Sequence, residues 1–378
     1  MKTTKYISML ALAAFALLGA ASCSDDEFGP SIFPDSEDEL DPNSYTYKFD
    51  KWLKQSYLTP YNLEFRYKMQ DVGTDMNYNL VPAEYDKAVD LAVLTKYLWF
   101  DVYDELAGEE FLKSYGPRII HLIGSPAYNP QTGTMVLGLA EGGIKVSLFR
   151  VNELNANSFA TMNEFYFKTM HHEFAHILHQ TKTYPAKFNT ISVGKYDGSN
   201  WQDRQEGVVL SCGFVTNYAS SAFREDFAEI IANYIVKTDA QWERFYELAG
   251  RGWATPSGDD PNAVYYCYYY YDNNDVKEEN KKFFLDDRMF VVETDDNGVE
   301  HYYYGTKTDK DGNRIIAYKV EDTDGIDGVA ALQEKIQIAR EWLRESFGVD
   351  LDKLREEVQK RQVSYDIVEL RKQIDNVQ

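Results

Sequence analysis

The residues best suited to chemistry lie in the stretch TMHHEFAHILHQ (169–180), which holds four of the six histidines of this 378-residue chain. His172 and His176 are four positions apart, so on an α-helix their side chains lie on one face, about one turn apart. Two imidazoles placed in this way can reach a single zinc ion. Glu173 is rotated by about 100° from His172, so it can reach a water molecule on the metal without being a ligand.

The residues around this His-Glu-x-x-His motif indicate a buried helix. They share an uncharged or apolar character: Thr169, Met170, Phe174, Ala175, Ile177 and Leu178. The alternative is a surface helix whose polar stripe carries the pattern by chance. A buried helix favours a metal site, because histidine or glutamate side chains left without partners in the interior cost free energy. We therefore expect one zinc ion per chain, bound by His172 and His176.

A catalytic zinc ion needs a third protein ligand and an open position. His179 is the nearest candidate, but on a straight helix it lies about 10 Å along the axis from His172, too far for one ion to contact both. We expect His179 to lie beside the site, facing a ligand or the substrate; a purely structural role is the alternative.

A second segment, FREDFAEIIANYIV (223–236), offers carboxylates at the same spacing as the histidines. Glu225 and Glu229 share a helix face, and the small Ala228 beside them allows a neighbouring helix to approach closely. Two solvated glutamates are the alternative, since glutamate is usually exposed.

The combination of His-Glu-x-x-His and, about fifty residues later, Glu-x-x-Ala-Glu resembles the gluzincin zinc peptidases. The resemblance implies that Glu225 is the third zinc ligand and that Glu229 steadies a zinc-binding histidine. The segment TNYASSAFREDFAE (216–229) is similar in layout to one in anthrax lethal factor, where a tyrosine seven residues before the ligand assists catalysis; the matching residue is Tyr218. The metzincin pattern is excluded, because it has glycine and histidine where this chain has His179 and Lys182.

The elements that must position these residues predict an α+β fold, because a few strands are followed mostly by helices. The resemblance implies a zincin-like fold with a small sheet, an active-site helix and a mostly helical C-terminal lobe. Thr161 and Glu164 form a capping-box pattern at the start of the histidine helix. Another helix is predicted over 82–106, with Pro82 in its first turn.

Strands are expected at several places. The segment 118–124 is expected to be a short apolar strand that places His121 in the core. The segment 143–148 is expected to be an edge strand that pairs with an extended peptide. The other expected elements are a strand over 63–69, a hairpin of 134–140 with 143–151, a meander over about 288–320 with turns at Asn297-Gly298 and Asp311-Gly312, and C-terminal helices over about 327–376.

The N-terminus has the pattern of an exported protein. Residues 1–22 combine two lysines with a short apolar run and small residues, which is typical of a signal peptide. AASC, ending at Cys23, resembles the site at which bacterial lipoproteins receive their lipid, and the acidic SDDE that follows resembles the export tag of Bacteroides-group lipoproteins. Residues 23–44 read as an acidic, flexible tether. We expect a domain over 45–378, anchored by Cys23 to the outer membrane and exposed at the cell surface.

Composition excludes one class of partner. The formal net charge of −22 repels phosphate backbones, so we expect no nucleic acid. Apart from Cys23 the chain contains Cys212 and Cys267, which either pair or remain as buried free thiols.

As a whole, the chain resembles the zinc-binding metallopeptidase lipoproteins of the Bacteroides group, usually found beside TonB-dependent importers. The resemblance implies a zinc hydrolase that cleaves a peptide or protein, with Glu173 as general base and Tyr218 assisting. One alternative is a glycan- or peptide-binding accessory of an importer, suggested by YYCYYYY (265–271), although such a run is more often core packing. Another is a metal hydrolase that acts on something other than peptides.

Overall fold

The computed structural model describes residues 40–69, 80–128, 133, 135–136, 138–141, 144–256, 264–285 and 289–377. The chain divides into two compact units, Met1–Asp50 and Lys51–Gln378. In the first unit the described residues are 40–50, so the predicted signal peptide, Cys23 and most of the tether lie outside the described part. None of the described helices combines the length and apolar character that a membrane crossing requires.

The first sheet of the second unit has four strands in the order β1-β2-β6-β5. The strands β1 (Glu64–Arg66), β2 (Ile119–Leu122) and β6 (Lys145–Leu148) run parallel, and β5 (Gly138–Glu141) is antiparallel to β6. β5 and β6 form the expected hairpin, whose turn residues 142–143 lie outside the described residues. The expectation that 143–148 is an edge strand is wrong, because β2 and β5 occupy both sides of β6. His121 is buried in β2, as predicted.

A long helical segment precedes β2. It consists of α4 (Tyr85–Thr95), a π-helical turn η2 (Lys96–Phe100) and α5 (Asp101–Ala107). Pro82 does not lie in its first turn: it forms an isolated bridge with Ile123, which holds the chain extended up to the cap residue Glu84. Apolar residues at helical spacing along this segment are buried in the core: Ala88, Leu91, Leu94, Leu98 and Val102.

The helix that carries the histidines, in contrast, begins earlier than predicted. Ser158 caps α7 (Phe159–Met162) by accepting a hydrogen bond from the backbone N–H of Thr161, and a π-helical turn η4 (Asn163–Phe167) leads into α8 (Lys168–Thr181). The predicted capping box of Thr161 and Glu164 is therefore wrong, because both residues are already inside the helical segment. The π-helical turn changes which residues face the core just before the motif.

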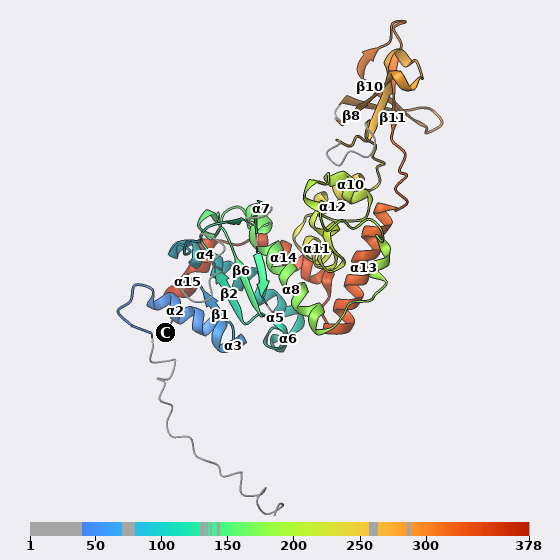
Figure 1. The fold of residues 1–378 in the computed structure, drawn as a ribbon. Coiled ribbons are helices and arrows are strands. Elements are labelled where there is room, and N and C mark those ends of the chain that lie inside the picture. Colours follow the sequence, from blue (N-terminus) through green and yellow to red (C-terminus); the bar gives the residue numbers. More distant parts are fainter. Residues whose placement is uncertain are drawn as a thin grey trace, which may run out of the picture. The chain divides into compact units, whose positions relative to one another are not determined.

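α11 (Phe223–Val236) packs against α8, α13 (Gly328–Phe347) and α14 (Leu351–Gln362) (Figure 1). α13 ends at Gly348 in a left-handed conformation, φ 72°, which glycine adopts without steric cost. Further helices and helical turns are η1 (Lys54–Leu58), α3 (Thr59–Tyr61), α6 (Glu109–Tyr115), η3 (Val151–Glu153), α9 (Phe188–Ile191), η5 (Trp201–Asp203), α10 (Glu206–Ser211), η6 (Tyr218–Ser221), α12 (Asp239–Ala249) and α15 (Ile367–Asp375).

A second, antiparallel sheet has five strands in the order β8-β7-β11-β10-β9. Its strands are β7 (Tyr268–Tyr271), β8 (Lys281–Phe284), β9 (Phe290–Thr294), β10 (Glu300–Thr308) and β11 (Arg314–Lys319). β9, β10 and β11 form a meander in the region where one was expected. The tyrosine run supplies β7, and Cys267 and Tyr268 belong to a buried cluster with Phe284 and Tyr304, which favours core packing for this part of the run. Two strands of two residues each, β3 (Ala127–Tyr128) and β4 (Met135–Val136), make a separate antiparallel pair.

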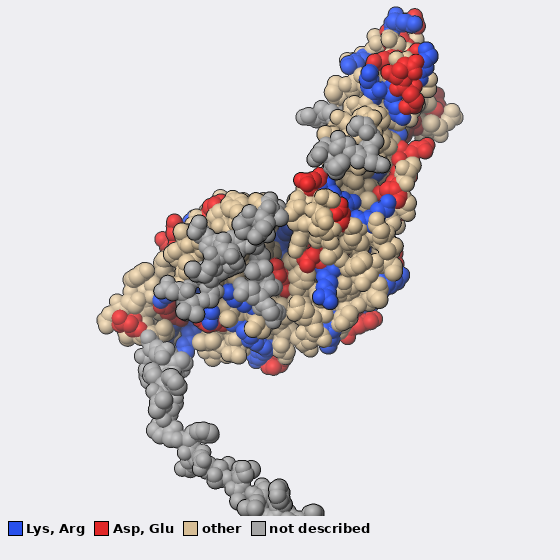
Figure 2. Space-filling model, viewed as in Figure 1, with Lys and Arg blue, Asp and Glu red and all other residues tan. Residues whose placement is uncertain are grey.

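Both remaining cysteines, Cys212 and Cys267, are free and buried. On the face that Figure 2 shows, basic side chains lie interspersed with acidic ones.

A fully buried ion pair fixes the start of α11 to α13. Lys335 Nζ lies 2.7 Å from Asp226 Oδ2 and donates to the Gly213 carbonyl at 2.6 Å. Tyr196 donates its hydroxyl to the same Asp226 oxygen at 2.6 Å. Because Asp226 directly precedes Phe227 and follows Glu225, this pair holds the turn of α11 that carries the predicted zinc ligand.

We predict that Lys335→Met lowers the free energy of unfolding by about 3–5 kcal/mol, because it leaves the buried Asp226 carboxylate without its cation. Urea denaturation measures the loss. The matched control is Lys360→Met, whose ammonium is largely exposed beside Glu357 and should change stability by less than about 1 kcal/mol. Equal, small losses of unfolding free energy in the two variants would contradict the claim that the Lys335–Asp226 pair stabilises the fold.

Candidate metal centre

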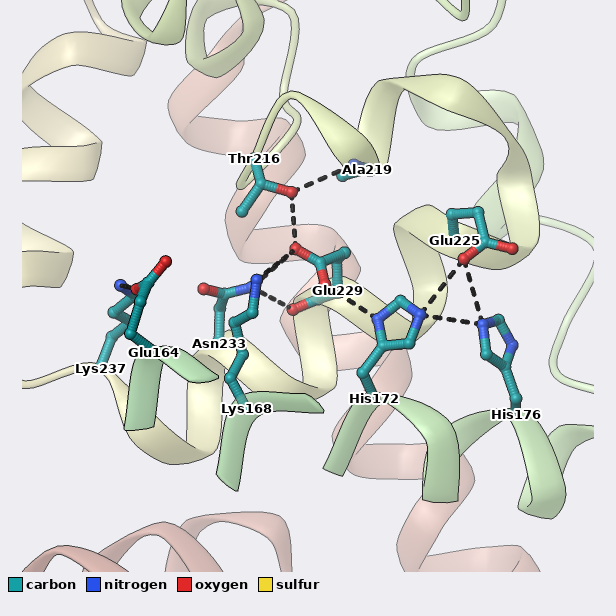
Figure 3. Close-up of polar contacts among 10 residues, drawn as sticks. All are labelled: Glu164, Lys168, His172, His176, Thr216, Ala219, Glu225, Glu229, Asn233 and Lys237. Atoms are coloured by element: carbon teal, nitrogen blue, oxygen red, sulfur yellow. Dashed lines mark hydrogen bonds and ion pairs between the residues drawn. The ribbon is translucent and has the colours of Figure 1, made fainter. Parts of the chain in front are cut away.

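α8 and α11 lie side by side and point three potential ligands at one another (Figure 3). Nε2 of His172 and Nε2 of His176 are 3.0 Å apart. Oε2 of Glu225 lies 3.2 Å from the first nitrogen and 3.1 Å from the second. The structure thus brings together the two histidines predicted from their spacing and the glutamate implied by the resemblance.

The donor set fits a zinc ion. Two imidazole nitrogens and one carboxylate oxygen are the ligands of one common class of catalytic zinc sites. Donor atoms about 2.05 Å from a tetrahedral zinc ion are separated from each other by about 3.3 Å. The triangle formed by His172, His176 and Glu225 is slightly smaller than this, so movements of a few tenths of an ångström would accommodate the ion.

The charges around the triangle favour a cation. Burial alone would lower the pKa of His172, but the carboxylates of Glu225 and Glu229 outweigh burial and raise that pKa to about 10. Burial also opposes ionisation of Glu225, yet its contacts with His172 and His176 hold the pKa of its carboxyl below the usual range. The protein therefore stabilises positive charge at this point, which a bound metal ion would supply.

Glu229 lies behind His172, on the side away from Glu225. Its Oε1 is 2.9 Å from Nδ1 of His172, a close contact without the alignment of a full hydrogen bond. Oε2 accepts from Thr216 Oγ1 at 2.6 Å and from Asn233 Nδ2 at 3.2 Å, and Lys168 Nζ is 3.6 Å away (Figure 3). A carboxylate on the other ring nitrogen orients Nε2 toward a metal.

Sequence reasoning missed the three residues that contact Glu229, although the helical spacing of two of them could have indicated their positions. Asn233 follows Glu229 by four positions and continues the polar stripe of α11, and Lys168 precedes His172 by four positions on α8. Thr216 lies outside both helices, so helical periodicity could not have indicated it.

His179 contacts the candidate ligand His176. Its Nε2 lies 2.8 Å from Nδ1 of His176. Burial, together with the positive charges of His176 and Arg224, lowers the pKa of His179 to about 4, so the ring is neutral near pH 7. When Nε2 of His176 binds a metal, its Nδ1 carries the proton and donates to His179, which orients the ligand.

Glu173 directly follows His172 on α8, and Tyr218 begins η6, which packs against α11. Glu173 is buried, and its negative charge contributes to raising the pKa of both His172 and Tyr218. The ring centroid of Tyr218 is 5.8 Å from that of His172 and 4.9 Å from that of Trp201. Burial and then the charge of Glu225 raise the pKa of the Tyr218 hydroxyl above its usual value, so this hydroxyl keeps its proton at neutral pH.

His171 lies outside the candidate ligand set. It is buried, and its Nδ1 lies 3.2 Å from the hydroxyl of Tyr103. Burial lowers the pKa of His171 to about 3, so the ring is neutral and part of the core.

Comparison with known proteins agrees with this geometry. Residues 43–352 match the family model described as "putative zinc-binding metallo-peptidase". A crystal structure of a putative zinc-binding metallo-peptidase from Bacteroides caccae ATCC 43185 is similar, with 32% sequence identity and a TM-score of 0.57, covering 89% of this chain and 98% of that chain. Among curated proteins, none matches. The chain therefore belongs to the family described as "putative zinc-binding metallo-peptidase".

Proposed function

We propose that this protein is a zinc-dependent peptidase with its active site at His172, His176 and Glu225. The observation that carries the proposal is the convergence of these three donor atoms beside the carboxylate of Glu173 and the protonated hydroxyl of Tyr218. Membership of the family supports the peptidase class.

The mechanism assigns each residue a separate task. Bound zinc would supply a polarised substrate carbonyl and a water molecule of lowered pKa. Glu173 accepts the proton of the attacking water and passes it to the leaving amine. Tyr218 donates a hydrogen bond to the negative charge that develops on the carbonyl oxygen, which stabilises the transition state.

The substrate of this proposal is a peptide or protein in extended conformation. β5 lies at the end of the first sheet and close to α8, so its outer edge is the position where an extended peptide could add as a further strand. The proposed peptide-binding strand is therefore β5 and not β6, which the sequence had suggested but which has strands on both sides.

A lipid anchor at Cys23 is the second part of the proposal. The support is the sequence of the leader and the acidic residues after it, which would place the enzyme at the outer membrane, beside a TonB-dependent importer. The net charge of −22 is compatible with a surface domain that is held away from anionic lipid.

We predict that three variants separate metal binding from chemistry. His172→Ala loses the single zinc ion that metal analysis finds in the wild type. Glu173→Ala keeps the zinc but lowers cleavage of a peptide library by about 10²–10⁴-fold, because the water loses its base. Tyr218→Phe keeps the zinc and lowers kcat with little change in KM. Full activity of Glu173→Ala, or a wild type without zinc, would refute the proposed mechanism.

We further predict that Thr216→Val weakens zinc binding by about 10–100-fold, because Glu229 loses a hydrogen bond and orients His172 less well. Competition with a chromogenic chelator measures the affinity. Thr308→Val, an exposed position in β10, is the matched control and should leave the affinity unchanged. Equal affinities in all three proteins would show that Glu229 does not depend on Thr216.

For the anchor, we predict that cells expressing Cys23→Ser incorporate no labelled palmitate into this protein and release it from the membrane fraction. Ser24→Ala is the control. Palmitate incorporation into the Cys23→Ser variant would contradict the assignment of Cys23.

A further inference from the structure

A pocket of about 400 Å³ lies directly beside the metal centre. His179 and Arg224 both line it: His179 contacts the ligand His176, and Arg224 directly precedes the ligand Glu225 on α11. Its other walls include Tyr184 and Asn189. A substrate residue in this pocket would therefore be a near neighbour of the bond that is cleaved.

The pocket carries the positive charge of Arg224. Arg224 is exposed and makes no ion pair with any residue in the described ranges. Among the described residues that line the pocket it is the one charged side chain, in a protein whose net charge is −22. Arginine presents a planar fork of N–H donors that matches the two oxygens of a carboxylate.

Asn189 and Tyr184 form further parts of the pocket wall. Asn189 lines the pocket, and its buried Oδ1 has no hydrogen-bond partner within the described part of the chain. The ring of Tyr184 is held in place by stacking on Phe227, with centroids 4.0 Å apart, which keeps the wall of the pocket rigid.

From this arrangement we infer that the pocket is a specificity subsite for a carboxylate, and that the enzyme prefers peptides with an acidic group close to the cleaved bond. The inference rests on the proposed peptidase function. The carboxylate comes either from an aspartate or glutamate side chain or from the C-terminus of the peptide, since Arg224 would bind both in the same way.

The test uses pairs of peptides that differ in one group. Each pair replaces glutamate by glutamine at one position around the cleavage site, or a free C-terminus by an amide. The wild type should cleave the carboxylate member of at least one pair with a kcat/KM higher by about tenfold or more, the effect of one charge-assisted hydrogen bond. The pair that responds identifies the source of the carboxylate.

Arg224→Gln should remove this preference, so that the two members of the responding pair are cleaved with equal kcat/KM. Arg244→Gln is the matched control, because Arg244 is an exposed arginine on α12 paired with Glu247, and it should keep the preference. An equal kcat/KM for both members of every pair, or an unchanged preference in Arg224→Gln, would overturn the inference while leaving the peptidase function intact.

A binding measurement separates failure of the inference from failure of the proposed function. If the wild type cleaves no peptide, the peptidase proposal fails, and fluorescence titration with the same labelled pairs still decides the role of the pocket. Tighter binding of the carboxylate peptide to wild type than to Arg224→Gln supports the subsite. Equal binding by the two proteins contradicts it.

Discussion

The packing of α8 against α11 is the constraint on which the metal centre depends. The first helix supplies both histidines and the second supplies Glu225, so the three donor atoms meet only if the two helices approach closely at one register. Ala228, next to Glu229 on α11, is fully buried, which fits a small residue where helices come close. Each donor alone contributes little to metal binding, and the site exists because the fold brings the three donors together.

Buried charges keep this register fixed. The Lys335–Asp226 pair ties the first turn of α11 to α13, and Glu229, one turn later, contacts His172 while Thr216 and Asn233 hold its other oxygen. Burying these charges costs free energy of solvation, which a well-packed apolar core would avoid. We interpret their presence as the cost of orienting ligands: His172 through Glu229 and His176 through His179.

How much of this the sequence could predict depends on the distance along the chain between interacting residues. His172 and His176 were predictable because helical spacing alone puts them together. The contact between His176 and His179 follows from the same rule, since residues three apart on a helix are neighbours. Glu225 is about fifty residues away, and only the resemblance to a known family connected it to the histidines. Thr216 was not predictable, because its role depends on the path of a loop. The edge-strand prediction failed because β2, which is distant along the chain, pairs with the side of β6 that the predicted hairpin leaves free. The capping prediction failed because Ser158, three residues before Thr161, caps the helix first.

The central claim is that His172, His176 and Glu225 bind one zinc ion together. Anomalous diffraction from crystals of the zinc-containing protein, recorded above and below the zinc absorption edge, tests it most directly. The account predicts one anomalous peak, about 2.0–2.2 Å from Nε2 of each histidine and from a carboxylate oxygen of Glu225. A peak with other ligands, or zinc bound without contact to Glu225, would contradict it.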